Sequence, residues 1–173
     1  MMEPSMQIGG SRDPEPGQPR MFGGAVGSGR LPWQWATEQL SKARTYWIAT
    51  TRPDGQPHSR PVWGVWLDGT FYFSTGSLAK QNLAANPAIT VHLESGSSVV
   101  IIEGLTEPAN ERVLREQVVP QYNEKYHWNL DPNNLPGPFY AVRPKKALGW
   151  HFEESAVSAQ STVLGNATRW RFV

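Results

Sequence analysis

Short runs of alternating hydrophobic and polar residues dominate this chain, and most of them are rich in aromatic and β-branched side chains. This pattern predicts β-strands rather than helices. The expected strands cover residues 45–51, 59–67, 71–74, 89–93, 98–105, 139–142, 147–152 and 168–173. Asp68-Gly69 is a strong two-residue hairpin sequence between the second and third of these runs. Five or more antiparallel strands with few helices predict a closed or nearly closed β-barrel, which leaves no exposed strand edges.

Helical spacing of apolar residues is confined to three short segments. Pro32 suits the first turn of a helix whose apolar side chains share one face. Ser77 is expected to be the N-cap of a second helix that ends near residue 85. Asn110 is expected to cap a third helix that runs to about residue 122.

The ends of the chain differ from its middle. Residues 1–30 hold seven glycines and four prolines with no periodicity, which predicts a disordered or extended N-terminal arm. Residues 31–173 are then expected to form a single domain. Within this domain, residues 154–167 are rich in Ala and Ser and are expected to form a linker-like loop.

Composition narrows the function classes. Sixteen Lys plus Arg against fifteen Asp plus Glu give no support for nucleic acid or a membrane surface as the main partner. The absence of cysteine excludes disulfides, thiol catalysis and Cys-ligated metals. The histidines lack ligand spacing with carboxylates, so no metal site is expected. No apolar run reaches membrane-spanning length and no secretory signal is evident, which favours a cytoplasmic protein.

The segment from residue 55 to residue 87 contains the most informative candidate site. Arg60 falls in the middle of an expected strand, and Gly76-Ser77-Leu78-Ala79-Lys80-Gln81-Asn82 follows the end of the next strand. This order places a helix N-terminus and two cationic side chains near one point, which suits a phosphate-bearing ligand. The alternatives are a solvated strand arginine and an exposed helix lysine. His58 shares a strand face with Arg60 and is a weak catalytic candidate, the alternative being a surface residue.

The chain has eight tryptophans, which can serve cores, ring-binding sites or subunit interfaces. Trp63 and Trp66 fall on opposite faces of their expected strand, so one should lie in the core while the other stacks on a ring or packs a dimer. Trp128 and Trp150 are each expected to lie in the core.

The ordered set of these motifs resembles the pyridoxamine 5′-phosphate oxidase-like split β-barrel family, which includes actinobacterial flavin- and deazaflavin-dependent reductases. The resemblance covers about residues 32–173. It rests on Ile48-Ala49-Thr50-Thr51, Asp54-Gly55-Gln56-Pro57, Arg60-Pro61-Val62-Trp63, Phe71-Tyr72-Phe73-Ser74-Thr75, Ser77 to Leu83, Asn86-Pro87, Glu103-Gly104 and Ala167-Thr168-Arg169-Trp170-Arg171-Phe172.

The resemblance implies an antiparallel Greek-key-type split β-barrel and a homodimer with two cofactor sites at the subunit interface. It implies FMN or the deazaflavin coenzyme F-420 as cofactor, and hydride transfer between that cofactor and a small organic substrate. Arg169 and Arg171 are then expected to reach an acidic cofactor tail, unless they form a charged edge strand. The implied cofactor-binding residues are Arg60, Val62, Trp63, Ser74, Thr75, Ser77, Lys80, Gln81, Asn82, Arg169 and Arg171.

Two departures from the family pattern matter. The FMN oxidases carry a lysine five residues after the strand arginine, and this chain has Val65 there. Their helix-opening motif places its lysine one position earlier than Lys80. Both departures disfavour pyridoxamine phosphate oxidation and favour the deazaflavin, while leaving the choice of cofactor open. A non-catalytic protein that binds a cofactor, haem or tetrapyrrole is the alternative from a different functional class.

Overall fold

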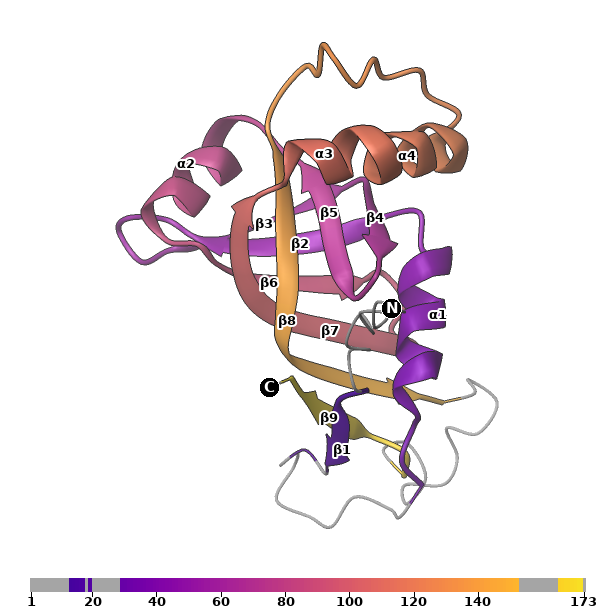
Figure 1. The fold of residues 1–173 in the computed structure, drawn as a ribbon. Helices are drawn as coiled ribbons and strands as arrows, with labels where there is room; N and C mark the ends of the chain where they lie inside the picture. Colours follow the sequence, from indigo (N-terminus) through magenta and orange to yellow (C-terminus); the bar gives the residue numbers. More distant parts are fainter. Residues whose placement is uncertain (1–12, 18, 20–28, 153–164, 173) are drawn as a thin grey trace, which may run out of the picture.

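The computed structural model describes residues 13–17, 19, 29–152 and 165–172, apart from the side chain of Ser77 (Figure 1). Every pair of neighbouring strands among them is antiparallel. The prediction of a mainly β chain with few helices is therefore confirmed. The elements are β1 Glu15–Gly17, α1 Trp33–Lys42, β2 Tyr46–Thr51, β3 Pro57–Val62, β4 Gly64–Leu67, β5 Thr70–Ser74, α2 Ser77–Ala85, β6 Ala88–Leu93, β7 Ser98–Pro108, α3 Glu111–Val113, η1 Leu114–Val118, α4 Val119–Tyr126, β8 Phe139–His151 and β9 Thr168–Arg171.

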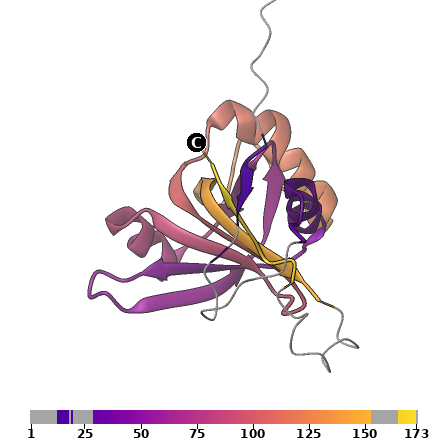
Figure 2. The ribbon, with the colours of Figure 1, turned by 90° about the horizontal axis from the view of Figure 1, so that it is seen from below.

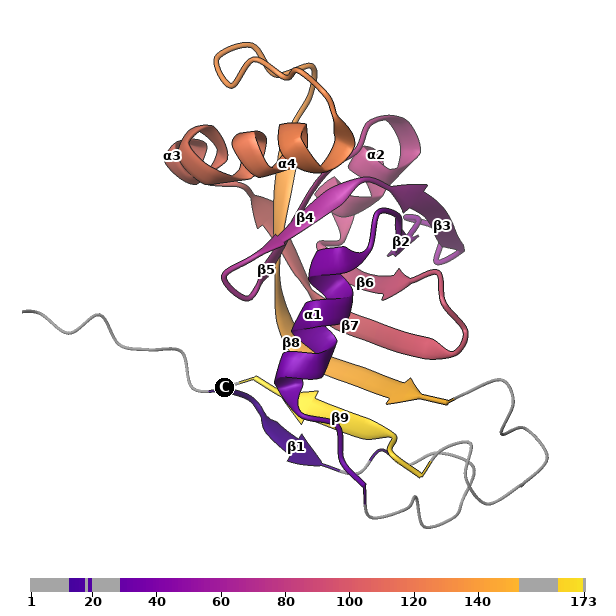
Figure 3. The same cartoon turned by 90° about the vertical axis from the view of Figure 1, so that its right-hand side faces the viewer.

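The strands form a split β-barrel. The main path of hydrogen-bonded neighbours is β1-β9-β8-β7-β6-β2-β3, and β5 joins β4 to the first part of β8. The single strand predicted over residues 59–67 is wrong. It is interrupted at Trp63, after which the chain leaves β2 and pairs with β5 instead. Strands β3 and β4 and helix α2 lie close to one another in Figure 3.

Strand β8 is long and bent, and it joins the two parts of the barrel (Figure 1). Two separate strands were expected over this range, and that expectation is wrong. The register with β7 shifts between Glu103 and Gly104, so that Glu103 faces Lys146 whereas Gly104 faces Pro144. Lys145 is the extra residue of this β-bulge, which bends the strand without ending it.

Alternation along the strands separates an inner from an outer face. One lateral row of paired residues is almost entirely buried and fills the barrel: Ile48, Val91, Ile102, Ala147 and Trp170. The neighbouring row points to the opposite face and is half-buried: Trp47, His92, Ile101, Leu148 and Arg169. Trp66 is buried with the inner residues, so the expectation that one residue of the Trp63 and Trp66 pair is core is confirmed.

Three helical segments cover parts of this sheet. Helix α1 lies beside β7 and β8 (Figures 1 and 3), and in Figure 2 it is seen end on beside the bent sheet. It buries Trp33, Ala36 and Leu40 on the predicted apolar face. The segments α3, η1 and α4 form one continuous helical run across the top of the barrel in Figure 1.

The helical run from residue 111 to residue 126 is longer than predicted. Asn110 caps it as expected, because its Oδ1 accepts from the backbone N–H groups of Arg112 and Val113 at 3.0 and 3.2 Å. Pro120 lacks an N–H, and the turn before it is π-helical: Val119 bonds to the carbonyl of Leu114. This turn brings Val118, Tyr122 and Tyr126 into a second core, together with Val65, Leu114 and Phe139.

Local turn predictions have mixed outcomes. Asp68 and Gly69 adopt φ angles of 47° and 75°, the geometry of the predicted type I′ hairpin turn. The prediction that Ser77 is an N-cap is wrong, because Gly76 occupies the cap position and Ser77 begins α2.

The structure describes only part of the predicted N-terminal arm and of the predicted loop near the C-terminus. Glu15–Gly17, inside the predicted arm 1–30, form β1 and pair with β9. Residues 1–12, 18 and 20–28 lie outside the described part, as does most of the predicted loop 154–167. Within the described ranges, no helix combines the length and apolar character that crossing a membrane requires.

Candidate functional site

A cavity of about 570 Å³ lies where the break between β3 and β4 meets the end of β5, the start of α2 and the loop after α4. This volume is within the range of about 300–1,000 Å³ that small-molecule sites occupy. The cavity is lined by Arg60, Trp63, Ser74, Thr75, Gly76, Lys80, Tyr122, Trp128, Leu130, Pro136, Gly137, Pro138 and Phe139. Five of the residues predicted from the sequence therefore come together here: Arg60, Trp63, Ser74, Thr75 and Lys80.

One wall of the cavity is cationic. Arg60 lies on β3 opposite Ile48, on the inner face of the sheet, and Lys80 lies in the first turns of α2. Neither forms an ion pair with any described residue. The Thr75 hydroxyl beside them is buried and has no hydrogen-bond partner in the described structure. Because Gly76 is the N-cap of α2, the unpaired amides of the first helical turn also begin here.

Another part of the lining forms an aromatic wall. Trp63 and Trp128 are 42 % and 55 % exposed, and their rings meet edge to face at 5.6 Å. Trp63 also stacks on Tyr126, with ring centroids 4.7 Å apart and planes within 7° of parallel. Burial raises the pKa of Tyr122, which keeps this phenol neutral. The wall therefore offers flat apolar surface for a ring, without negative charge.

The loop after α4 carries part of this aromatic wall. His127 adopts a left-handed conformation with φ 53° and ends the helix. The Asn123 side chain then holds Leu130 by two hydrogen bonds, of 2.8 and 3.0 Å. The prediction that Trp128 is a core residue is wrong, because this helix ending places the indole at the cavity.

Several other predicted residues lie near the cavity but are not among the described residues that line it. Val62 is 7 % exposed and belongs to the barrel core. Gln81 is exposed on α2. Asn82 is fully buried and donates from Nδ2 to the Thr50 hydroxyl at 3.0 Å, which attaches α2 to β2, while its Oδ1 has no partner in the described structure. His58 lies with Nδ1 3.4 Å from the same Thr50 hydroxyl.

Arg169 and Arg171 are remote from this cavity within one chain. Both lie on β9, whereas Arg60 lies on β3 at the other end of the strand path. Arg60 belongs to the inner row through Ile48, and Arg169 belongs to the outer row through Leu148. Within one chain, these two arginines and Arg60 therefore lie on different faces of the sheet, and neither Arg169 nor Arg171 is among the described residues that line the cavity.

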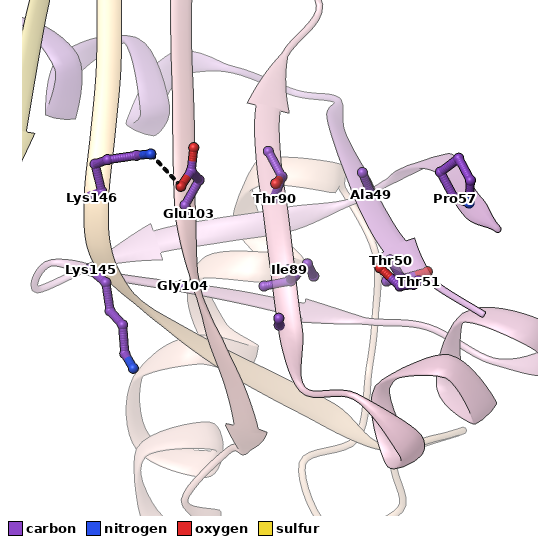
Figure 4. Close-up of a pocket in the computed structure, with 11 residues that line it drawn as sticks. Ala49, Thr50, Thr51, Pro57, Ile89, Thr90, Glu103, Gly104, Lys145 and Lys146 are labelled. Carbon is purple, nitrogen blue, oxygen red and sulfur yellow. Dashed lines mark ion pairs between the residues drawn. The ribbon is translucent and has the colours of Figure 1, made fainter. Parts of the chain in front are cut away.

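A second cavity, of about 410 Å³, lies over strands β2, β6, β7 and β8 (Figure 4). Glu103 and Lys146 form an ion pair of 2.6 Å at its edge, and Lys145 points away from that pair in Figure 4. Because Lys146 is already paired with Glu103, Lys145 is the one lysine of this described lining without a described carboxylate partner, whereas the cavity at Arg60 offers two such cations, Arg60 and Lys80. No group of three or more potential metal-ligating side chains occurs in the described part of the chain.

Sequence reasoning missed the contribution of α4 and the loop 127–138 to the first cavity. Tyr122 was within a predicted helix, and no role in a site was predicted for the loop 127–138, whose sequence is marked only by its Pro and Asn content. The π-helical turn before Pro120 sets which side of the helix meets the barrel. The spacing of apolar residues in the sequence does not predict this rotation of the helix. A tryptophan directly after the end of a helix was the single available indication.

The comparisons with known proteins agree with this fold. A sequence model of the pyridoxamine 5′-phosphate oxidase family matches residues 34–168. The chain belongs to this family. The resemblance found from the sequence motifs is thereby confirmed. No curated protein matches the chain.

Solved structures of distant relatives share the split β-barrel. A conserved hypothetical protein from Mycobacterium tuberculosis is 21 % identical, with 79 % of this chain and 100 % of that chain covered and a TM-score of 0.61. An FAD-binding protein from Mesorhizobium loti is 18 % identical over 80 % and 93 % of the two chains, with a TM-score of 0.56. A haem storage protein from Vibrio cholerae is 16 % identical over 66 % and 90 %, with a TM-score of 0.53. At these identities the likeness establishes the fold alone.

Proposed function

We propose that this member of the pyridoxamine 5′-phosphate oxidase family is an oxidoreductase that binds a flavin-type cofactor in the cavity between Arg60 and Trp63. The observation that carries the proposal is the pairing of a cationic wall with an aromatic wall in one cavity. Such a site suits a ligand with a planar ring at one end and a phosphate at the other. FMN and coenzyme F-420 both have this form.

The residues of the cationic wall fit the phosphate. Arg60 and Lys80 have no described anionic partner, and the Thr75 hydroxyl is buried without a hydrogen bond. An unpaired buried hydroxyl costs about 1–3 kcal/mol, which a phosphate oxygen would relieve. The N-terminus of α2 adds backbone donors and a partial positive charge.

The remaining residues would orient the ring and exclude water. When bound, a reduced flavin or deazaflavin supplies a hydride for a small organic acceptor. Trp63, Tyr122 and Trp128 offer the flat surface against which the ring and the acceptor can be held in contact. We assign no obligatory proton donor to the chain, because the described lining contains no histidine or carboxylate and burial, by raising the pKa of Tyr122, makes its phenol a weaker acid. Solvent can supply the proton.

The residue at position 65 favours the deazaflavin over FMN as the cofactor. Val65 is 2 % exposed and lies in the core under α4, so this position offers no cation to a phosphate. The cavity is therefore less cationic than the FMN phosphate site implied for the oxidases of this family. The long acidic tail of F-420 would instead be bound by cations outside this cavity, the role expected of Arg169 and Arg171.

A homodimer would complete the site. The outer face carries the half-buried apolar side chains of Trp47, Ile101 and Leu148. Covering this face with a second copy would protect it from water. It would also allow Arg169 and Arg171 of one protomer to approach the cavity of the other.

Titration with cofactors tests the proposal. The absorbance spectrum and mass of any ligand that copurifies should identify a flavin or deazaflavin. Fluorescence titration of the stripped protein with FMN and with F-420 should then show saturable binding, tighter for F-420. Turnover of the reduced cofactor with an organic acceptor completes the test. Tight binding without turnover would favour the non-catalytic binder, and binding of neither cofactor would overturn the proposal.

Light scattering of the protein without cofactor tests the dimer separately. We expect twice the monomer mass at micromolar concentration. A monomer at this concentration would contradict the two-chain site while leaving the cavity of one chain as a candidate.

A further inference from the structure

The backbone at the break between β3 and β4 is held by two consecutive side chains at the end of α4. Gly64 is the first residue of β4 and directly follows Trp63. Its N–H donates to the Tyr126 hydroxyl at 2.9 Å. The same hydroxyl lies 2.8 Å from the carbonyl oxygens of Gly64 and Arg44, and can donate to either. The Lys125 ammonium also donates to the Gly64 carbonyl, at 3.0 Å.

The break has no room to move toward the barrel. A Cβ added at Gly64 would lie 2.5 Å from the Phe71 ring and 2.6 Å from the Tyr72 carbonyl oxygen. Backbone and ring are thus already as close as a glycine allows. Because β5 blocks one side and the end of α4 holds the other, the position of Gly64 also fixes the Cα of Trp63.

The Trp63 ring is held by the same element. It stacks on Tyr126 at a centroid distance of 4.7 Å, while it also lines the cavity. Tyr126 therefore contacts Trp63 in two ways, through the ring face and through the backbone of the next residue. None of the groups named on the cationic wall takes part in this arrangement.

Lys125 lies in an unusual setting for a lysine. Its Nζ donates to the Tyr46 hydroxyl at 2.7 Å and lies 4.8 Å from the centre of the Tyr46 ring and 5.5 Å from that of Tyr126. Burial, and then the charge of Arg44, lower the pKa of Lys125 to about 8. The charged or titratable groups that face it are Arg44, Tyr46 and Tyr126. No described carboxylate pairs with it.

We propose that Lys125 and Tyr126 are positioning residues that fix the Trp63 indole as a wall of the cavity. The placement of Trp63 follows from these contacts alone. The consequence for a bound ring rests on the proposed function, because a misplaced indole weakens the stacking surface that the ring would use. Loss of the charge on Lys125 removes its attraction to the two tyrosine rings. The surroundings of Trp63 should therefore change as Lys125 titrates.

Fluorine NMR on the full chain labelled with fluorotryptophan tests the placement without any ligand. The Trp63 resonance is assigned from its loss in Trp63→Phe. We expect it to shift with an inflection at pH about 8 in the wild type. The inflection should be absent in Lys125→Met and in Lys125→Arg, while Lys125→Arg keeps the wild-type position at low pH. Tyr126→Phe should move or broaden the resonance at every pH, whereas the exposed control Lys42→Met should leave it unchanged.

Titration with FMN tests the consequence for binding. We expect the dissociation constant to rise about tenfold in Lys125→Met and Tyr126→Phe, because each variant loses hydrogen bonds that hold the Gly64 backbone beside Trp63, and to be rescued in Lys125→Arg. An unchanged Trp63 resonance in both variants would overturn the proposal, whatever FMN does. Unchanged FMN affinity in variants whose Trp63 resonance has moved would overturn its consequence for binding. If neither FMN nor F-420 binds the wild type, the proposed function falls, and the fluorine spectra still decide the placement of Trp63.

Discussion

The two walls of the cavity differ in how they are held. The cationic wall consists of Arg60 and Lys80, whose charged groups have no described partner and project from an edge strand and a short helix. The aromatic wall is packed and hydrogen-bonded: Trp63 stacks on Tyr126, and Tyr126 and Lys125 bind the backbone of Gly64. The charged groups of the cationic wall are thus available to a ligand, whereas the side chains of the aromatic wall are already held by contacts within the protein.

This difference predicts how each wall responds to change. Removing an unpaired charge takes away nothing that the fold uses, so the effect should fall on ligand binding alone. Removing a packed ring or a held backbone position should lower the free energy of unfolding as well as binding. Measurements of stability and of affinity on the same variants therefore separate the two walls.

Gly64→Ala should have the largest effect. The new Cβ would lie 2.5 Å from the Phe71 ring and 2.6 Å from the Tyr72 carbonyl oxygen, so β4 must shift. We expect the free energy of unfolding in urea to fall by about 3 kcal/mol, as for an overpacked core site. Gly96→Ala is the matched control, since no atom lies within 4 Å of its added Cβ. Equal stability of the two variants would show that the break is not tightly held.

Arg60→Ala and Lys80→Ala should leave the stability unchanged and weaken cofactor binding. Each charge-assisted hydrogen bond is worth about 1.5–3 kcal/mol, so the FMN or F-420 dissociation constant should rise roughly ten- to a hundredfold. Raising the salt concentration should weaken wild-type binding in the same direction. Arg112→Ala, on an exposed helix, is the control. Wild-type affinity in both variants would remove the anion site from this wall and direct attention to Arg169 and Arg171.

The cationic wall could be predicted from the sequence because local order determines it. A strand arginine, a hairpin turn and a helix start follow one another within residues 55–87, and the antiparallel return brings them together. The hairpin at Asp68-Gly69 is local in the same sense, because two residues with positive φ set it. The split-barrel fold followed from the alternation of the strands and from the family resemblance.

The aromatic wall could not be predicted, because contacts between distant segments determine it. Lys125 meets Tyr46 and Gly64 only after the barrel has formed, and the π-helical turn before Pro120 sets the face that α4 presents. The bend of β8 could not be predicted for the same reason, because a contact with another strand determines it. Its bulge depends on the register with β7, where Gly104 has no space for a side chain because Arg143 lies against it.

The stability of the wild type should depend on pH through the aromatic wall. The pKa of Lys125 is lowered from 10.5 to about 8, so between these values the unfolded chain binds a proton that the folded chain has released. The free energy of unfolding should therefore rise with pH across this window, by about 1 kcal/mol because solvent screens a half-buried group. Burial raises the pKa of Tyr46 and that of Tyr126, the latter to about 12. Above about 10 these phenols oppose the rise, since the unfolded chain loses protons that the folded chain keeps.

Urea unfolding at a series of pH values checks this sign. Lys125→Met should lose the rise between pH 8 and 10.5 while keeping the decline at higher pH. The same rise in Lys125→Met and in the wild type would assign it to a different group.

His58→Ala should have the smallest effect on cofactor affinity. It is the most direct comparison for Arg60→Ala. His58 and Arg60 lie two residues apart on β3 and share one face of the strand. Only Arg60 is among the described residues that line the cavity, whereas the His58 ring lies 3.4 Å from the Thr50 hydroxyl, a long and weak hydrogen bond. We expect the cofactor dissociation constant of His58→Ala to change by about twofold or less, since no contact with the ligand is lost. Fluorescence titration beside Arg60→Ala measures both on one scale. A loss of affinity for His58→Ala as large as that for Arg60→Ala would mean that the ligand extends along β3, beyond the cavity between the two walls.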